Sequence, residues 1–189
     1  MVWSCFLYGQ VKTNYQIITE QSEVILDSLM KSLPDSAKNI ELGMNNLDPE
    51  RRSFMINTIG RIAGKYNKTV SLESGNLKID FQQMEIRPVY NEESLKLLGL
   101  NKKIRRELGL SLSGYVKDLG SGTIKSIFDS EKKFEDIISS SDISNLEKSP
   151  YTFTRGSFEN KLKWTKYIEP GIVVASVSVL IYLFYSMRY

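Results

Sequence analysis

The sequence predicts an α+β (or α/β) protein: a small head in which helices pack on a sheet as a sandwich, followed by one C-terminal transmembrane helix. Three observations lead to this prediction. Helix-like and strand-like periods alternate through the first two thirds of the sequence, as in helices that cover a sheet. A glycine-containing turn joins two strand-like runs at Asp118–Gly122. Finally, no charge interrupts the apolar run from Pro170 to Met187.

The first half of the head alternates helix and strand signals. Apolar residues at helical spacing predict a helix over 19–33, closed by Pro34, and alternating residues predict a strand over 39–44. Asp48 is the expected N-cap of a second helix, with Pro49 at its first position. The apolar stripes of the two helices are Val24, Ile25, Leu29 and Leu33, then Met55, Ile59, Ile62 and Tyr66.

The second half of the head reads mainly as strands. A short strand over 69–73 and a turn over 74–76 precede a long strand over 76–90. The apolar parity changes at Gln82–Gln83, which predicts a β-bulge, and Pro88 predicts a strand end or an edge position. A hairpin follows, with strands over 107–117 and 123–128. Beyond it the sequence becomes polar, and we expect only a short helix over 142–148.

We divide the chain into residues 1–10, a head over 11–147, a linker over 148–167 and an anchor over 168–189. Residues 1–9 are apolar and Gln10 begins the polar chain, so this piece resembles the end of an export signal. The alternative is an ordinary apolar N-terminus that packs on the head. Residues 148–160 lack any period and contain Ser, Thr and Gly, which is typical of a linker.

The charge-free run near residue 189 has the length and flanks of a membrane anchor. As a helix, 170–187 would be about 27 Å long, enough to cross a bilayer core. We expect Trp164, Tyr167 and Tyr185 to form its interfacial belt and assign Pro170, Gly171, Ala175, Leu180 and Phe184 to the anchor. Gly171 and Ala175 would also permit weak homo-oligomerisation through the helix. The alternative is a buried helix of the head.

Composition narrows the chemistry. The net charge is +3, so we expect no nucleic-acid partner, since such proteins usually carry a strongly basic face. The sequence has no histidine and a single cysteine, Cys5, which excludes the common zinc sites and the Ser-His-Asp and Cys-His arrangements. We therefore expect no catalytic residue, metal or cofactor. An enzyme that uses carboxylates, lysine or serine remains the alternative.

One dense basic cluster, Lys102, Lys103, Arg105 and Arg106, is a candidate contact for a partner protein or a lipid headgroup. The alternative is a solvated loop or strand entry. An exposed strand edge near Pro88 is a second candidate docking surface.

Two parts of the sequence resemble known bacterial envelope proteins. The element order from Val24 to Phe128 resembles the small α/β heads of curli-secretion and lipoprotein-activator accessory proteins. The tail, with Glu169-Pro170 at its entry and Tyr-Leu-Phe-Tyr-Ser-Met-Arg over 182–188, resembles single-pass proteins of the Bacteroidota. The resemblance implies a membrane-anchored, non-catalytic accessory module that binds the bilayer and an envelope protein. It carries over no functional residue.

The location of the head depends on two conflicting signals. Basic residues precede the anchor at Arg155, Lys161, Lys163 and Lys166, and only Arg188 follows it, which favours a cytoplasmic head and a tail-anchored adaptor. The signal-like N-terminus instead favours export. Because export at the N-terminus would commit the head before the anchor is reached, we predict a periplasmic head.

Overall fold

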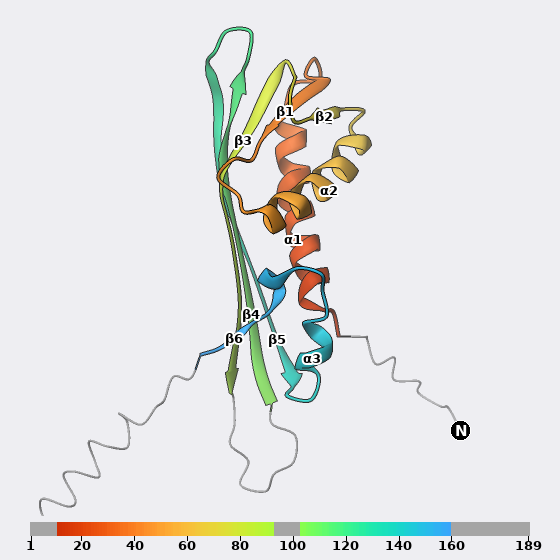
Figure 1. Ribbon diagram of the computed structural model, residues 1–189, viewed down its shortest axis with the longest axis vertical. Helices are drawn as coiled ribbons and strands as arrows, with labels where there is room; N and C mark the ends of the chain where they lie inside the picture. Colours follow the sequence, from red (N-terminus) through yellow and green to blue (C-terminus); the bar gives the residue numbers. More distant parts are fainter. Residues whose placement is uncertain (1–10, 93–102, 160–189) are drawn as a thin grey trace, which may run out of the picture. The chain divides into compact units, whose positions relative to one another are not determined.

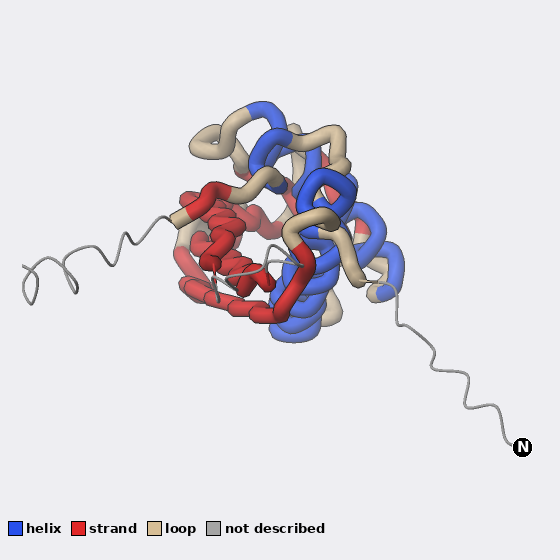
Figure 2. Tube along the Cα trace, turned by 90° about the horizontal axis from the view of Figure 1, so that it is seen from below, coloured by secondary structure: helices blue, strands red, loops and turns tan. Residues whose placement is uncertain are grey.

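The computed structural model describes residues 11–92 and 103–159, and it confirms a mixed α+β head (Figure 1). Its elements are α1 (Asn14–Ser32), β1 (Asn39–Gly43), α2 (Pro49–Lys65), β2 (Thr69–Ser71), β3 (Leu77–Glu92), β4 (Lys103–Asp118), β5 (Ile124–Ser139), α3 (Ile143–Leu146), η1 (Thr152–Thr154) and β6 (Ser157–Phe158). The strands form one sheet in the order β2-β1-β3-β4-β5, and β6 pairs with β3. Helices α1 and α2 pack on one face, which we call the inner face (Figure 2).

Helix α1 begins at Asn14, five residues before the predicted start at Thr19, because of a capping box at Thr13. The Thr13 hydroxyl accepts from the Gln16 amide at 3.2 Å, and the Gln16 side chain accepts from the Thr13 amide at 2.8 Å. Ile25 and Leu29 are buried as predicted, whereas Val24 is 53% exposed. The prediction for Val24 was wrong because the buried stripe follows Ile18, Ser22, Ile25 and Leu29, and Val24 lies beside it.

Helix α2 confirms its predicted start. The Asp48 carboxylate accepts from the amides of Glu50 and Arg51, both at 3.0 Å, and Pro49 occupies the first turn. Met55, Ile59 and Ile62 are fully buried against the sheet. The predicted apolar stripe therefore packs into the core.

The sheet joins a short parallel part to a long antiparallel part. Strand β1 is parallel to β2 and β3, and β3, β4 and β5 form an antiparallel meander of three 16-residue strands. The predicted bulge is confirmed between Phe81 and Gln83. Pro88 does not end β3, but β1 pairs only with 77–80 and β6 only with 89–90. Among the described strands Pro88 thus has only β4 as a neighbour, which suits a residue without an amide hydrogen.

Strand β5 continues eleven residues beyond the predicted end at Phe128, to Ser139. On its inner face Phe128 and Phe134 are half-buried and Ile138 is buried. Between Phe128 and Ile138 most of the other residues are charged, so the apolar alternation that marks a half-covered strand is weak. The sequence prediction missed this half of the hairpin for that reason.

The head extends past the predicted boundary at 147, through Phe158. We call Tyr151–Phe158 the C-terminal strap. Phe153 is 9% exposed and packs in the main core, with its ring centroid 5.6 Å from that of Phe54 and 5.1 Å from that of Tyr151. The Thr152 amide and hydroxyl both donate to the Glu50 carboxylate at 2.7 Å. This part of the predicted linker is therefore a structured part of the head.

Several predictions fall outside the described residues: the 1–10 segment, Lys102, and the belt and anchor at Trp164, Tyr167, Pro170, Gly171, Ala175, Leu180, Phe184 and Tyr185. Across 11–92 and 103–159, no helix has the length and apolar character needed to span a membrane.

Candidate functional site: an open cleft at the distal end

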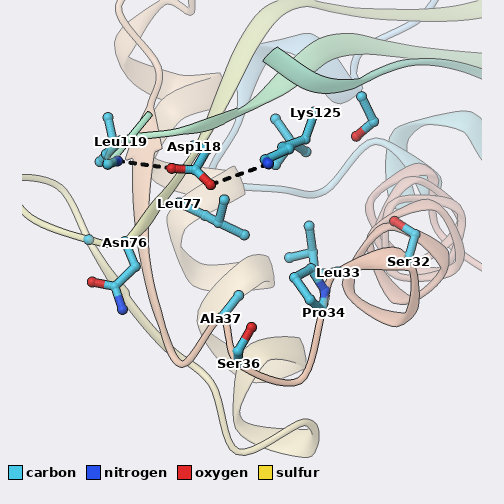
Figure 3. Close-up of a pocket in the computed structure, with 14 residues that line it drawn as sticks. Ser32, Leu33, Pro34, Ser36, Ala37, Asn76, Leu77, Asp118, Leu119 and Lys125 are labelled. Atoms are coloured by element: carbon cyan, nitrogen blue, oxygen red, sulfur yellow. Dashed lines mark hydrogen bonds and ion pairs between the residues drawn. The ribbon is translucent and has the colours of Figure 1, made fainter. Parts of the chain in front are cut away.

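A cleft of about 880 Å³ lies at the end of the head where α1 finishes and β3 begins, which we call the distal end (Figure 3). It is lined by the end of α1 and the loop after it, by the start of β3, and by the β4–β5 turn. The lining residues are Ser32, Leu33, Pro34, Ser36, Ala37, Gly75, Asn76, Leu77, Val116, Asp118, Leu119, Gly120, Lys125 and Ser126.

The wall made by residues 33–38 is held by a buried ammonium group. The Lys68 side chain donates to the carbonyl oxygens of Pro34 at 2.9 Å and Ala37 at 3.1 Å. The opposite wall is tied to the sheet, since the Leu119 amide donates to the Asn76 carbonyl at 3.1 Å. Both walls are therefore preformed, as a binding surface requires.

The β4–β5 turn at the cleft is organised by Asp118. Its carboxylate accepts from the amides of Gly120 at 2.9 Å and Ser121 at 3.0 Å, and the Lys125 ammonium lies 3.5 Å away (Figure 3). The hydrogen bond from the Ser121 amide is the main cause that lowers the pKa of Asp118. Gly122 has a φ of 72°, a conformation that favours glycine.

The lining of the cleft combines one ion pair with hydroxyl and apolar groups. Asp118 and Lys125 are the charged residues of the lining, and they neutralise each other. The Ser32 hydroxyl donates to the Leu29 carbonyl at 2.7 Å, so its proton is held by a backbone acceptor and not by a side-chain base. On the β4–β5 turn, Leu119 lines the cleft and is 37% exposed. Ile124 and Ile127 are 57% and 79% exposed at the same end of the head, but they pair with Lys117 and Tyr115 on the face of the sheet away from the helices. Among the described residues there is no group of three or more potential metal ligands.

The opposite, proximal end contains a buried polar network in place of the predicted basic patch. Arg106 is fully buried and binds Asp136 through two hydrogen bonds of 2.8 and 2.6 Å. Its remaining donor group, Nη1, reaches the Lys12 carbonyl at 2.8 Å and the Asn14 side chain at 3.0 Å. The guanidinium lies over the Phe134 ring, 5.7 Å from its centroid.

Asn14 extends this network to the C-terminal strap. Its side-chain amide donates to the Tyr90 hydroxyl and to the Thr154 carbonyl, both at 2.8 Å. Burial raises the pKa of Tyr90 to about 12, so its hydroxyl stays protonated at any physiological pH. Gly156 packs closely on the same ring. A Cβ atom added at position 156 would lie 2.4 Å from Tyr90 Cε2, which is too close for any side chain. The network joins α1, β3, β4, β5 and the strap.

The predicted basic cluster is therefore not a single surface. Lys103 is exposed, Arg105 lies on the outer face 3.2 Å from Glu135, and Arg106 points into the head. The prediction for Arg106 was wrong because the alternation in β4 extends to its start. Ile104 and Arg106 share the inner face with Leu108, and this parity could have been read from the sequence.

The distal cleft was not predicted as a site, although its turn was. Its walls come from three segments that are distant in the sequence, and no local motif marks their meeting. No protein-family model matches this sequence, and comparison with curated proteins finds no match either.

Proposed function

We propose that the protein is a membrane-anchored, non-catalytic interaction module of the bacterial cell envelope, which binds a partner protein at its distal cleft. The observation that carries the proposal is the cleft of about 880 Å³, whose walls are held by hydrogen bonds and whose lining includes the exposed apolar side chain of Leu119. Exposed apolar groups next to a concave surface are typical of interaction sites.

The position of the cleft supports this function. The Tyr90 end of β3 lies beside the strap, while Leu77 at the other end lines the cleft. Thirteen residue steps of strand separate them, or about 43 Å. A partner at the cleft would therefore approach the end of the head far from Phe158, the last residue of the strap.

The first test compares capture of partners by two matched variants. Leu119→Asp places a charge in the lining of the cleft, and Val24→Asp places one at an exposed position on α1. Native membranes are crosslinked, the tagged protein is isolated, and its adducts are quantified by mass spectrometry. We expect Leu119→Asp to lose an adduct that Val24→Asp keeps. Equal adducts in wild type and both variants would refute docking at the cleft.

The anchor and the side of the membrane are tested separately. The protein should stay in the membrane pellet after alkaline carbonate extraction, and replacing Val174 and Leu180 with Asp should release it. Protease added to intact spheroplasts should digest the head if it is periplasmic. Protection there, with digestion only in inverted vesicles, would instead support the cytoplasmic, tail-anchored alternative.

A further inference from the structure

Strand β5 forms a long open edge of the sheet. It is the last strand in the order and pairs only with β4 among the described strands, over all or nearly all of Ile124–Ser139. The other edge strand, β2, has three residues. Every second residue of β5 therefore turns its amide and carbonyl groups away from β4, where another strand can bind them.

The side chains of this edge are exposed and carry both signs of charge. From Asp129 to Ile137 the exposed residues are Asp129, Glu131, Lys132, Lys133, Glu135 and Ile137. If all the charges on this edge had the same sign, they would repel a second copy of the chain in every register. Because both signs are present, some registers of β5 against β5 bring opposite charges together and others bring like charges together.

We propose that β5 pairs antiparallel with β5 of a second copy, in a register centred on Phe134. This would join two heads into one continuous sheet. The only two-fold axis that relates neighbouring antiparallel strands is normal to the sheet. This rotation keeps each residue on the same face of the sheet, and directly opposite residues must share a face. Each residue must therefore be opposite a residue an even number of positions away, so one residue, the centre of the register, is opposite its own copy.

The charges select one register. Because β5 spans 124–139, a pairing of eleven or more residues must be centred at a position from 129 to 134. Four of these six centres place a charge opposite its own copy: Asp129, Glu131, Lys132 and Lys133. A fifth, Ser130, places Asp129 opposite Glu131. Like charges directly opposite each other are destabilising. Of the six centres, only Phe134 places no like charges opposite each other.

The register centred on Phe134 also creates attractive pairs. Lys133 of one copy faces Glu135 of the other on the outer face, and this occurs twice across the axis. On the inner face Lys132 faces Asp136 twice, and Asp136 remains 26% exposed beside Arg106. Within each copy Arg105 lies 3.2 Å from Glu135 and Lys133 lies 3.0 Å from Glu131, so the new pairs would extend an existing alternation of charge.

A shorter register centred on Phe128 also avoids like charges. It pairs only nine residues, 124–132, and has one type of opposite-charge pair, Lys125 with Glu131. It also includes the irregularity of the ladder at Val116 and Lys117, which would disturb pairing at that end. The dimer is independent of docking at the cleft and of any contact through the anchor.

A charge exchange tests the dimer in the full chain. Lys133→Glu alone opposes Glu135 of the other copy twice, and Glu135→Lys alone opposes Lys133 twice. We expect each to weaken dimerisation about tenfold, measured by sedimentation in detergent micelles. Both substitutions in one chain recreate opposite charges and should restore it. A monomeric wild type, or a dimer that neither single substitution weakens, would overturn the proposal.

Cysteine crosslinking tests the register. In a Cys5→Ser background, one tagged copy carries Lys133→Cys and a second, differently tagged copy carries Glu135→Cys. Directly opposite residues lie close enough for a disulfide, so this mixture should crosslink on oxidation. The matched mixture of Glu131→Cys with Glu135→Cys should not crosslink, because positions 131 and 135 are directly opposite each other only in the register centred on Lys133. Crosslinking of the second mixture alone would contradict the proposed register.

Discussion

The two ends of the head are built in opposite ways. At the proximal end, Arg106, Asn14 and Tyr90 are fully buried. Their polar groups bind one another, the Asp136 carboxylate, or the backbone of Lys12 and of the strap. At the distal end, the cleft is open and Ile124 and Ile127 are exposed. Burial of polar groups costs free energy unless each finds a partner, and exposure of apolar groups costs free energy unless something covers them.

This difference separates the two ends by role. At the proximal end, Arg106, Asn14 and Tyr90 have hydrogen-bond partners, and these contacts hold the start of α1 and the strap on the sheet. The distal end leaves apolar surface uncovered while its walls stay fixed by Lys68 and Asp118. We therefore expect substitutions at the proximal end to change the stability of the head, and substitutions at the distal end to change its binding.

The largest effect should come from Arg106→Leu. Removal of the guanidinium leaves Asp136 and the Asn14 side chain without their buried partner. We expect a loss of about 3–5 kcal/mol of unfolding free energy. Arg105→Leu is the matched control on the outer face, where the side chain is 43% exposed, and should cost about 1 kcal/mol or less. Denaturant unfolding followed by circular dichroism measures both, and equal losses would show that the network is unimportant.

The next effect tests whether the strap belongs to the head. Phe153→Ala removes a ring that packs against Phe54 and Tyr151 in the core. We expect a loss of about 3 kcal/mol, and faster proteolysis after Arg155. Phe158→Ala, at a position that is 52% exposed, should cost much less. If the two variants melt alike, the strap is a linker after all.

A smaller effect is expected from Gly156→Ala. The new methyl group would collide with the Tyr90 ring, which is fully buried and hydrogen-bonded to Asn14. A forced shift of this kind costs about 1–3 kcal/mol. Gly109→Ala has open space at its Cβ and should be close to neutral. The melting temperatures of the two variants test this prediction. If Gly156→Ala melts at the same temperature as wild type, the strap is only loosely held against Tyr90.

The smallest effect is a dependence on pH at Glu50. Hydrogen bonds from the Thr152 hydroxyl and amide lower the pKa of Glu50 below its usual value of 4.5. A carboxyl whose pKa is depressed in the folded state stabilises the fold above its unfolded pKa, and this contribution disappears as the pH falls through the folded pKa. The melting temperature of wild type should therefore exceed that of Glu50→Gln at pH 7, and the difference should shrink below pH 4.5. A constant difference from pH 7 to pH 3 would refute this contact.

Local signals in the sequence were sufficient for much of the fold. Asp48-Pro49 marked a helix start, and the parity change at Gln82–Gln83 marked the bulge, because each feature depends on neighbouring residues. Features that depend on distant residues were missed. Phe153 looked like part of a linker since its partner Phe54 is about a hundred residues away, and the cleft is made by three separate segments.

The buried guanidinium of Arg106 shows a different failure. A dense run of basic residues suggested a surface, whereas the strand alternation placed every second one inside. Asp136, the residue that makes this burial tolerable, lies in the half of β5 that the prediction did not assign to a strand. The pair becomes visible only once the β4–β5 register is known.

The central claim is that a partner binds at the distal end, and site-specific crosslinking tests it most directly. In a Cys5→Ser background, a benzophenone label is placed at Ser126→Cys, which lines the cleft, or at Ser157→Cys, which is exposed on the strap. After illumination of native membranes, the Ser126 label should give an adduct with a second protein and the Ser157 label should not. An adduct with a second protein from the Ser157 label alone would contradict the account.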